Sequence, residues 1–142
     1  LDAAYEVLKG ETTVDGRPLK IVRIPMAIPF YYEIDEGDYL HEVWQETALE
    51  MADGLPDGSP FPTGRMTVLP AMSYCNFLIT NGLVIGQKFW KEGVDEAVRE
   101  RDAEALAVLK SCFPDREVIQ INTIPLNLLG GGIHCGTHQI PA

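Results

Sequence analysis

The C-terminal run Leu129–Ala142 (LGGGIHCGTHQIPA) concentrates the side chains of this sequence that could do chemistry. Its three consecutive glycines let the backbone adopt positive φ and approach a neighbouring segment or a ligand closely. Cys135 follows them, flanked by His134 and His138. A thiol on a glycine-hinged turn beside imidazoles is typical of a cysteine nucleophile, although free cysteines are also common as inert, buried core residues. We predict that Cys135 is a nucleophile.

Metal and phosphate sites are weaker interpretations of the same run. His134, Cys135 and His138 supply only three ligands within five residues, and no second cluster accompanies them, so we expect no metal. The glycines are not followed by the Lys-Ser/Thr of a phosphate loop. His41-Glu42 begins like a zinc-protease helix, but Gln45 stands where the second histidine is needed. No cofactor is expected.

The charge of the chain indicates which classes of partner it can bind. The net charge is −10, and nine acidic residues with no Lys or Arg lie between Glu33 and Asp57. Such a field disfavours nucleic acid and anionic membranes and favours a cationic ligand, although a solvated acidic loop is also consistent. No apolar run could span a bilayer, no signal peptide is evident, and the three cysteines are widely spaced. We therefore expect a cytoplasmic protein with reduced thiols.

Periodicity and turn signals predict the elements that must position Cys135. The Asn81-Gly82 pair between two apolar runs predicts a hairpin, because such turns need positive φ. An amphipathic helix and an apolar strand follow it, which together form a ββαβ unit. Residues 1–24 resemble the helix–strand half of an equivalent unit, so a repeated α/β architecture is expected. The predicted segments are a helix at Leu1–Lys9, a turn at Asp15-Gly16, strands at Leu19–Ile24, Ser73–Thr80, Leu83–Gly86 and Glu117–Ile121, helices at Asp38–Asp53 and Val94–Ser111, and a loop at Gly54–Gly64.

Three segments resemble one known family. GGGIHCGTHQIP at 130–141 is similar to the C-terminal cysteine motif of the agmatine deiminase and bacterial peptidylarginine deiminase family, and SYCNFLITNGLVI at 73–85 and CFPDREVIQI at 112–121 match further motifs. Members usually carry an asparagine before the Ile-His-Cys and a glutamine at the position of His138. The resemblance implies the C-terminal portion of a longer chain, in agreement with the missing initiator methionine.

The fold that the resemblance implies is a five-fold pseudosymmetric α/β propeller built of ββαβ modules. Residues 1–24 would end one module, 25–72 would be an acidic, Pro/Gly-rich insertion, 73–121 a ββαβ module, and 126–142 the catalytic-cysteine segment. Part of a closed propeller would expose apolar module faces, so we expect self-association or a longer parent chain.

The activity that the resemblance implies is hydrolytic deimination of a guanidinium group through a covalent Cys135 intermediate. Agmatine, converted to N-carbamoylputrescine and ammonia, is the first expected substrate, and a peptidyl arginine side chain is the alternative. The family's acid/base histidine and its carboxylates lie in motifs that do not occur in this sequence. An inactive fragment that acts as an assembly module or binds a cationic ligand is therefore the alternative from another class.

The remaining candidate residues surround Cys135. Asn76 resembles a family asparagine that lies near the nucleophile and positions substrate, but it could equally satisfy backbone groups at a strand start. Gly131, Gly132 and Thr137 are further substrate-binding candidates. His134 is expected to be structural, because neighbours on a strand point to opposite faces. Cys75 and Cys112 are interpreted as core thiols.

Overall fold

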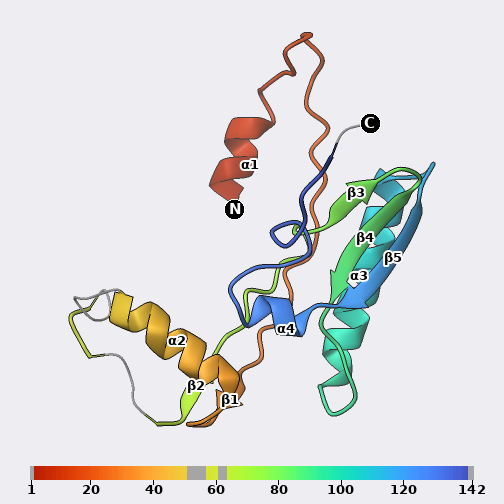
Figure 1. Cartoon of the computed structure of the whole chain (residues 1–142). Coiled ribbons are helices and arrows are strands. Elements are labelled where there is room, and N and C mark those ends of the chain that lie inside the picture. The colour runs from red at the N-terminus through yellow and green to blue at the C-terminus, as the bar shows by residue number, and fades with distance from the viewer. Residues whose placement is uncertain (1, 51–56, 61–63, 141–142) are drawn as a thin grey trace.

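The chain forms a mixed α/β piece, and the computed structural model describes residues 2–50, 57–60 and 64–140 (Figure 1). None of the helices in these ranges is long and apolar enough to cross a membrane. The elements in chain order are α1 (Asp2–Leu8), β1 (Tyr32–Ile34), α2 (Tyr39–Glu50), β2 (Met66–Val68), β3 (Leu78–Thr80), β4 (Leu83–Lys88), α3 (Glu96–Cys112), β5 (Glu117–Asn122) and α4 (Ile124–Asn127).

A three-stranded sheet, in the order β3-β4-β5, is the framework of the second half of the chain. β3 and β4 form the predicted antiparallel hairpin, in which Leu78 pairs with Ile85, and Gly82 supplies the positive φ of 74° that the turn needs. β4 and β5 run parallel, with Val84 opposite Val118. The predicted hairpin, helix and strand of this half are therefore confirmed as elements.

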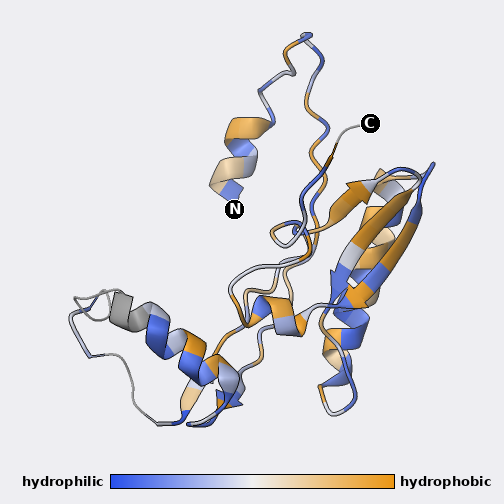
Figure 2. Cartoon of the chain, in the orientation of Figure 1, coloured by the Kyte–Doolittle hydropathy of each residue, from blue (hydrophilic) through white to orange (hydrophobic). Residues whose placement is uncertain are grey.

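α3 is the crossover helix between these parallel strands, and it packs against the sheet. Asp95 caps its start by accepting a hydrogen bond from the Ala97 N–H at 2.8 Å. Its buried apolar face includes Leu109, which contacts Val84 and Val118 in one core cluster. The strands carry mostly hydrophobic residues, whereas the helix alternates hydrophobic and hydrophilic ones (Figure 2).

A second, two-stranded sheet lies within residues 25–72. β1 and β2 are antiparallel, with Ile34 opposite Met66, and α4 lies between this ribbon and the larger sheet in the view of Figure 1. Both strands were missed by the sequence analysis. The predicted helix at Asp38–Asp53 is confirmed over Tyr39–Glu50 as α2, while its last three residues lie outside the described residues, so the acidic segment is not simply a loop. Most of the predicted Gly54–Gly64 loop lies outside the described residues.

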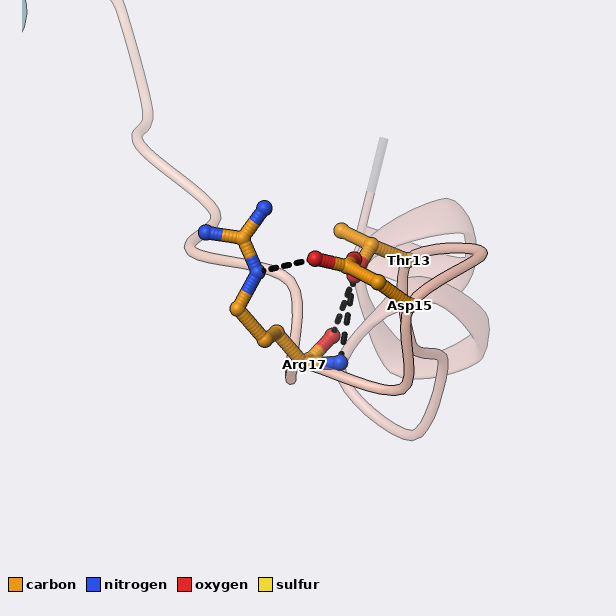
Figure 3. Close-up of polar contacts among 3 residues, drawn as sticks. All are labelled: Thr13, Asp15 and Arg17. Atoms are coloured by element: carbon orange, nitrogen blue, oxygen red, sulfur yellow. Dashed lines mark hydrogen bonds and ion pairs between the residues drawn. The ribbon is translucent and has the colours of Figure 1, made fainter.

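The predicted turn at Asp15-Gly16 is confirmed in the segment that follows α1 (Figure 3). Gly16 adopts a φ of 79°, and the Thr13 N–H donates to the Arg17 carbonyl at 2.8 Å. The Thr13 hydroxyl and the Arg17 guanidinium, which donates to Asp15 at 2.6 Å, lower the pKa of the Asp15 carboxyl.

Two predictions of local structure are wrong. Leu19–Ile24 is not a strand, because no described segment offers it a ladder of hydrogen bonds; a single bridge joins Thr12 and Pro18 nearby. The first hairpin strand begins only at Leu78, because the chain turns at residues 74–75, where the Asn76 N–H donates to the Ser73 carbonyl at 3.2 Å.

Candidate active site

Cys135 lies in a turn that spans residues 133–136, beyond α4. The Gly136 N–H closes this turn by donating to the Gly132 carbonyl at 3.0 Å, and the Thr137 N–H donates to the His134 carbonyl at 3.2 Å. The Cys135 side chain is exposed. A turn presents the thiol to solvent, so Cys135 is not a buried core cysteine in the described structure, and its role as the nucleophile stays a prediction.

Asn76 is the side chain that contacts the thiol, although the two residues are 59 positions apart in the sequence. Its Nδ2 donates to the Cys135 Sγ at 2.9 Å. Its Oδ1 accepts the His134 N–H at 2.8 Å and the Cys135 N–H at 3.4 Å. Because both backbone donors need the amide oxygen, the NH₂ end of Asn76 has to face the sulfur. The amide therefore holds the turn and the nucleophile together.

The contact with Asn76 favours the ionised thiol. A donor that points at the sulfur stabilises the thiolate more than the thiol. The Asn76 side chain, and after it the Gly132 backbone, lower the pKa of Cys135, while burial opposes them. A lowered pKa gives more thiolate at neutral pH, and the thiolate is the nucleophilic form.

Gly131 and Gly132 lie so close to Asn76 and Cys135 that a side chain at either position would meet these residues. A Cβ on Gly131 would lie 3.3 Å from the Cβ of Cys135. A Cβ on Gly132 would lie 2.7 Å from both the Asn76 Cγ and the Gln87 Oε1, closer than real Cβ contacts allow. Residues 73–77 (the Asn76 loop) and residues 133–136 (the Cys135 turn) therefore approach each other so closely that position 132 requires glycine.

A buried carboxylate on α3 anchors the loop that carries Asn76. Asp102 is 4% exposed; its Oδ1 accepts the Tyr74 hydroxyl at 2.7 Å, and its carboxylate accepts the Phe89 and Trp90 N–H groups at 2.8–3.1 Å. Burial, and then the hydrogen bond to Asp102, raise the pKa of Tyr74. Asp102 was not predicted from the sequence, because it lies among the other charged residues of a helix with a solvated face.

Several predicted roles near the thiol need correction. His134 lies in a turn and not on a strand, so the argument from opposite strand faces does not apply, and its side chain is exposed. The Thr137 hydroxyl donates to the His134 carbonyl at 3.1 Å. Cys75 and Cys112 are exposed, so their interpretation as core thiols is wrong. The part of the chain that the structure describes brings Asn76, Gly131 and Gly132 to Cys135; their binding of substrate stays a prediction.

No group of three His, Cys, Asp or Glu side chains that could hold a metal ion occurs among the described residues. A cavity of about 640 Å³ lies between α1, residues 21–27 and residues 72–75. Asp2 and Arg23 form an ion pair at its wall, and Cys75 lines it, whereas Cys135 does not.

Comparisons with known proteins identify the family of this chain. The family model described as Porphyromonas-type peptidyl-arginine deiminase matches residues 1–141. An agmatine deiminase of Pseudomonas fluorescens is 33% identical over 140 residues, which is 99% of this chain and 32% of that protein, and one of Pseudomonas putida is 35% identical with the same coverage. The chain thus spans about a third of the length of these curated relatives.

Solved structures give the same result. The agmatine deiminase of Enterococcus faecalis is similar with a TM-score of 0.58 and 26% identity, covering 94% of this chain and 30% of that one. An X-ray structure provisionally identified as an agmatine deiminase has a TM-score of 0.65 and 30% identity, covering 99% of this chain and 32% of that one.

Proposed function

Because this chain belongs to the family of Porphyromonas-type peptidyl-arginine deiminases, we propose that it contributes the cysteine of a guanidine-hydrolysing active site. The observation that carries the proposal is the contact of the Asn76 amide with the exposed Cys135 thiol at 2.9 Å, which favours the thiolate. A thiolate is a suitable nucleophile for the carbon of a guanidinium, which is cationic and stabilised by resonance.

The reaction follows from this nucleophile. The Cys135 thiolate adds to the guanidinium carbon; one amino group of the adduct takes a proton, its C–N bond breaks, and ammonia leaves. A cationic amidino-thioether remains on the sulfur. Water then adds to the same carbon and loses a proton, the C–S bond breaks with return of the thiolate, and loss of a second proton gives the urea. One water is consumed and one ammonium is released, and a nearby group must transfer the protons.

Agmatine is the substrate that we propose first. The relatives named agmatine deiminase support it, and so does the acidic segment at Glu33–Asp57, which would attract a second cationic group of the substrate. A peptidyl arginine is the second candidate, favoured by the description of the family model and by the exposure of Cys135 at the surface of this chain. Gly131, Gly132 and Thr137 are proposed to lie beside the bound guanidinium, together with Asn76.

The propeller of ββαβ modules and the module boundaries are also part of the proposal. The hairpin–helix–strand order of β3, β4, α3 and β5 supports them. The acid/base histidine and the carboxylates that grip the guanidinium are proposed to lie outside these 142 residues, on a longer parent chain or a second copy. A cytoplasmic setting, which keeps thiols reduced, suits a free cysteine nucleophile.

The test is mass spectrometry of the products after a longer parent chain, which contains these 142 residues and the proposed acid/base groups, is incubated with agmatine and, separately, with an arginine peptide. We expect N-carbamoylputrescine from agmatine, lost in Cys135→Ala and kept in Cys112→Ala, which removes an exposed thiol from the end of α3. Product that persists in Cys135→Ala would exclude this nucleophile. Binding of agmatine without any product from either substrate would favour the inactive, cation-binding alternative.

A further inference from the structure

Three polar side chains are almost completely buried between the Asn76 loop and the Cys135 turn. Gln87 on β4 is 0% exposed, Thr123 before α4 is 2% exposed and Asn127 in α4 is 1% exposed. Buried amides and hydroxyls destabilise a fold unless they are hydrogen-bonded, so their partners indicate what the fold gains from them.

Both ends of the Gln87 amide are bonded to different segments. Its Nε2 donates to the Ser73 carbonyl at 2.6 Å, three residues before Asn76. Its Oε1 accepts the Thr123 hydroxyl at 2.7 Å and the Asn127 Nδ2 at 3.0 Å. The partners fix the orientation of the amide, because a flipped amide would set donor against donor.

Asn127 extends this network to the glycines before Cys135. The two N–H groups of its Nδ2 are shared among three acceptors, which are the Gln87 Oε1, the Gly131 carbonyl at 2.8 Å and the Ala71 carbonyl at 3.1 Å. Its own carbonyl accepts the N–H groups of Ala71 at 2.9 Å and Gly130 at 3.1 Å. The segment before Asn76 and the segment before Cys135 are therefore both tied to Asn127, whose side chain is in turn bonded to Gln87.

Gln87 also meets the cysteine segment directly. The space that a Cβ on Gly132 would occupy is bounded by the Gln87 Oε1 and the Asn76 Cγ, each 2.7 Å away. Gly132 is thus packed between the amides of Gln87 and Asn76. A displacement of Gln87 would be transmitted to Asn76 by two routes, through the Ser73 carbonyl and through Gly132.

We propose that Gln87 is a positioning residue for Cys135: its buried amide, with Thr123 and Asn127, holds the Asn76 loop against the glycine turn, so that the Asn76 Nδ2 stays on the sulfur. Gln87 does not touch the sulfur, and it acts through Asn76. The inference rests on the proposed role of Cys135 as the nucleophile. It concerns the reactivity of the thiol, which can be measured without turnover.

The test is the pH profile of Cys135 alkylation by iodoacetamide, quantified per peptide by mass spectrometry. In Gln87→Met, which has a similar shape and no amide, we expect the Cys135 profile to move to higher pH and its rate at pH 7 to fall roughly three- to tenfold, because the thiolate loses its donor. The exposed Cys75 and Cys112 are alkylated in the same sample, and the profile of Cys112 should not move.

A matched control separates positioning from general damage. Gln120→Met removes the neighbouring amide on β5, which donates to the carbonyls of Gln87 and Asp102 at 3.0 Å. Among the described residues it makes no hydrogen bond to the Cys135 turn. We expect Gln120→Met to lower stability without moving the Cys135 profile. Thr123→Val, which keeps the side-chain shape, gives a milder variant whose profile should move in the same direction as that of Gln87→Met.

A double-mutant cycle completes the test. If Gln87 acts through Asn76, Gln87→Met should change the Cys135 rate in the native background but not in Asn76→Ala. An unmoved profile in both folded Gln87→Met and Thr123→Val would overturn the proposal, and so would an effect of equal size in Asn76→Ala. Failure of the proposed deimination would leave this alkylation result unchanged, so the two failures are distinguishable.

Discussion

Gly132→Ala is the substitution whose effect the structure specifies most closely. The added Cβ would lie 2.7 Å from the Asn76 Cγ, 2.7 Å from the Gln87 Oε1 and 2.9 Å from the Asn76 Oδ1. None of these atoms is the end of a free side chain, since each amide is held by several hydrogen bonds. The strain must therefore be relieved by moving a bonded group.

The size of that movement can be worked from the distances. Ordinary contact begins at 3.4 Å, so each neighbour at 2.7 Å has to give way by about 0.7 Å. If Asn76 moves by that amount, its 2.9 Å contact with the Cys135 sulfur lengthens to about 3.6 Å. A contact that is longer, or bent away from the N–H direction, stabilises the thiolate less, because hydrogen-bond strength falls with distance and with misalignment. Overpacking a close site typically costs about 1–3 kcal/mol of unfolding free energy.

Gly136→Ala is the matched control on the other side of Cys135. Its added Cβ would meet the Gly132 carbonyl at 3.5 Å and the Ile133 carbonyl at 3.9 Å, which is ordinary contact, and Gly136 does not adopt positive φ. Urea unfolding and the pH profile of Cys135 alkylation give the two readouts. We expect Gly132→Ala to lose stability and to need higher pH for alkylation, while Gly136→Ala changes both little. Equal behaviour of the two variants would refute the argument.

Three further predictions concern the same framework. Asn76→Asp should move the Cys135 alkylation profile further to higher pH than Asn76→Ala does. The lowered pKa of Cys135 depends first on the Asn76 donor, and a carboxylate at this position would in addition repel the thiolate. A larger shift in Asn76→Ala than in Asn76→Asp would contradict a donor role for Asn76. Asp102→Asn should lower the free energy of unfolding, measured in urea titrations, by about 1–3 kcal/mol, because an amide cannot accept from Tyr74, Phe89 and Trp90 together. The exposed Glu104→Gln on the same helix is the control, and it should change this free energy by less than about 0.5 kcal/mol. Gly86→Ala should also destabilise the fold by about 1–3 kcal/mol, since its Cβ would lie 2.9 Å from the Leu109 Cδ1, and a measurably smaller cost in the Leu109→Ala background would identify that contact as the cause.

The elements that the sequence predicted correctly depend on local signals. Asn81-Gly82 between apolar runs marks the hairpin, and the period of apolar residues marks α3, because both signals lie within a few residues of the structure that they specify. β1 and β2 were missed for the opposite reason. Each strand has only three residues, and Glu33 pairs with Thr67, so no local sequence pattern predicts the two-stranded sheet of β1 and β2.

The two incorrectly predicted strand segments show that an apolar segment forms a strand only where a neighbouring segment can accept and donate its backbone hydrogen bonds. Leu19–Ile24 has the composition of a strand, but the described residues offer it no ladder. Residues 73–77 are adjacent to a real strand, yet the Ser73 carbonyl bonds the Gln87 side chain and also accepts the Asn76 N–H at 3.2 Å, which turns the chain. A side chain distant in sequence here replaces the neighbouring strand as hydrogen-bond partner.

The candidate site divides in the same way. Cys135, Asn76 and the glycines could be selected from the sequence, because their types suit the chemistry and their motifs resemble a known family. The side chains that hold them could not, since Gln87 sits in an apolar strand and Asp102 in a charged helix, where each looks ordinary. Both side chains act through contacts that form only when β4, α3 and α4 pack together. We expect these contacts to maintain the 2.9 Å distance between the Asn76 amide and the sulfur. The reactivity of the cysteine is therefore expected to depend on residues outside its motif, and a substitution at Gln87 should change it as surely as one at Asn76.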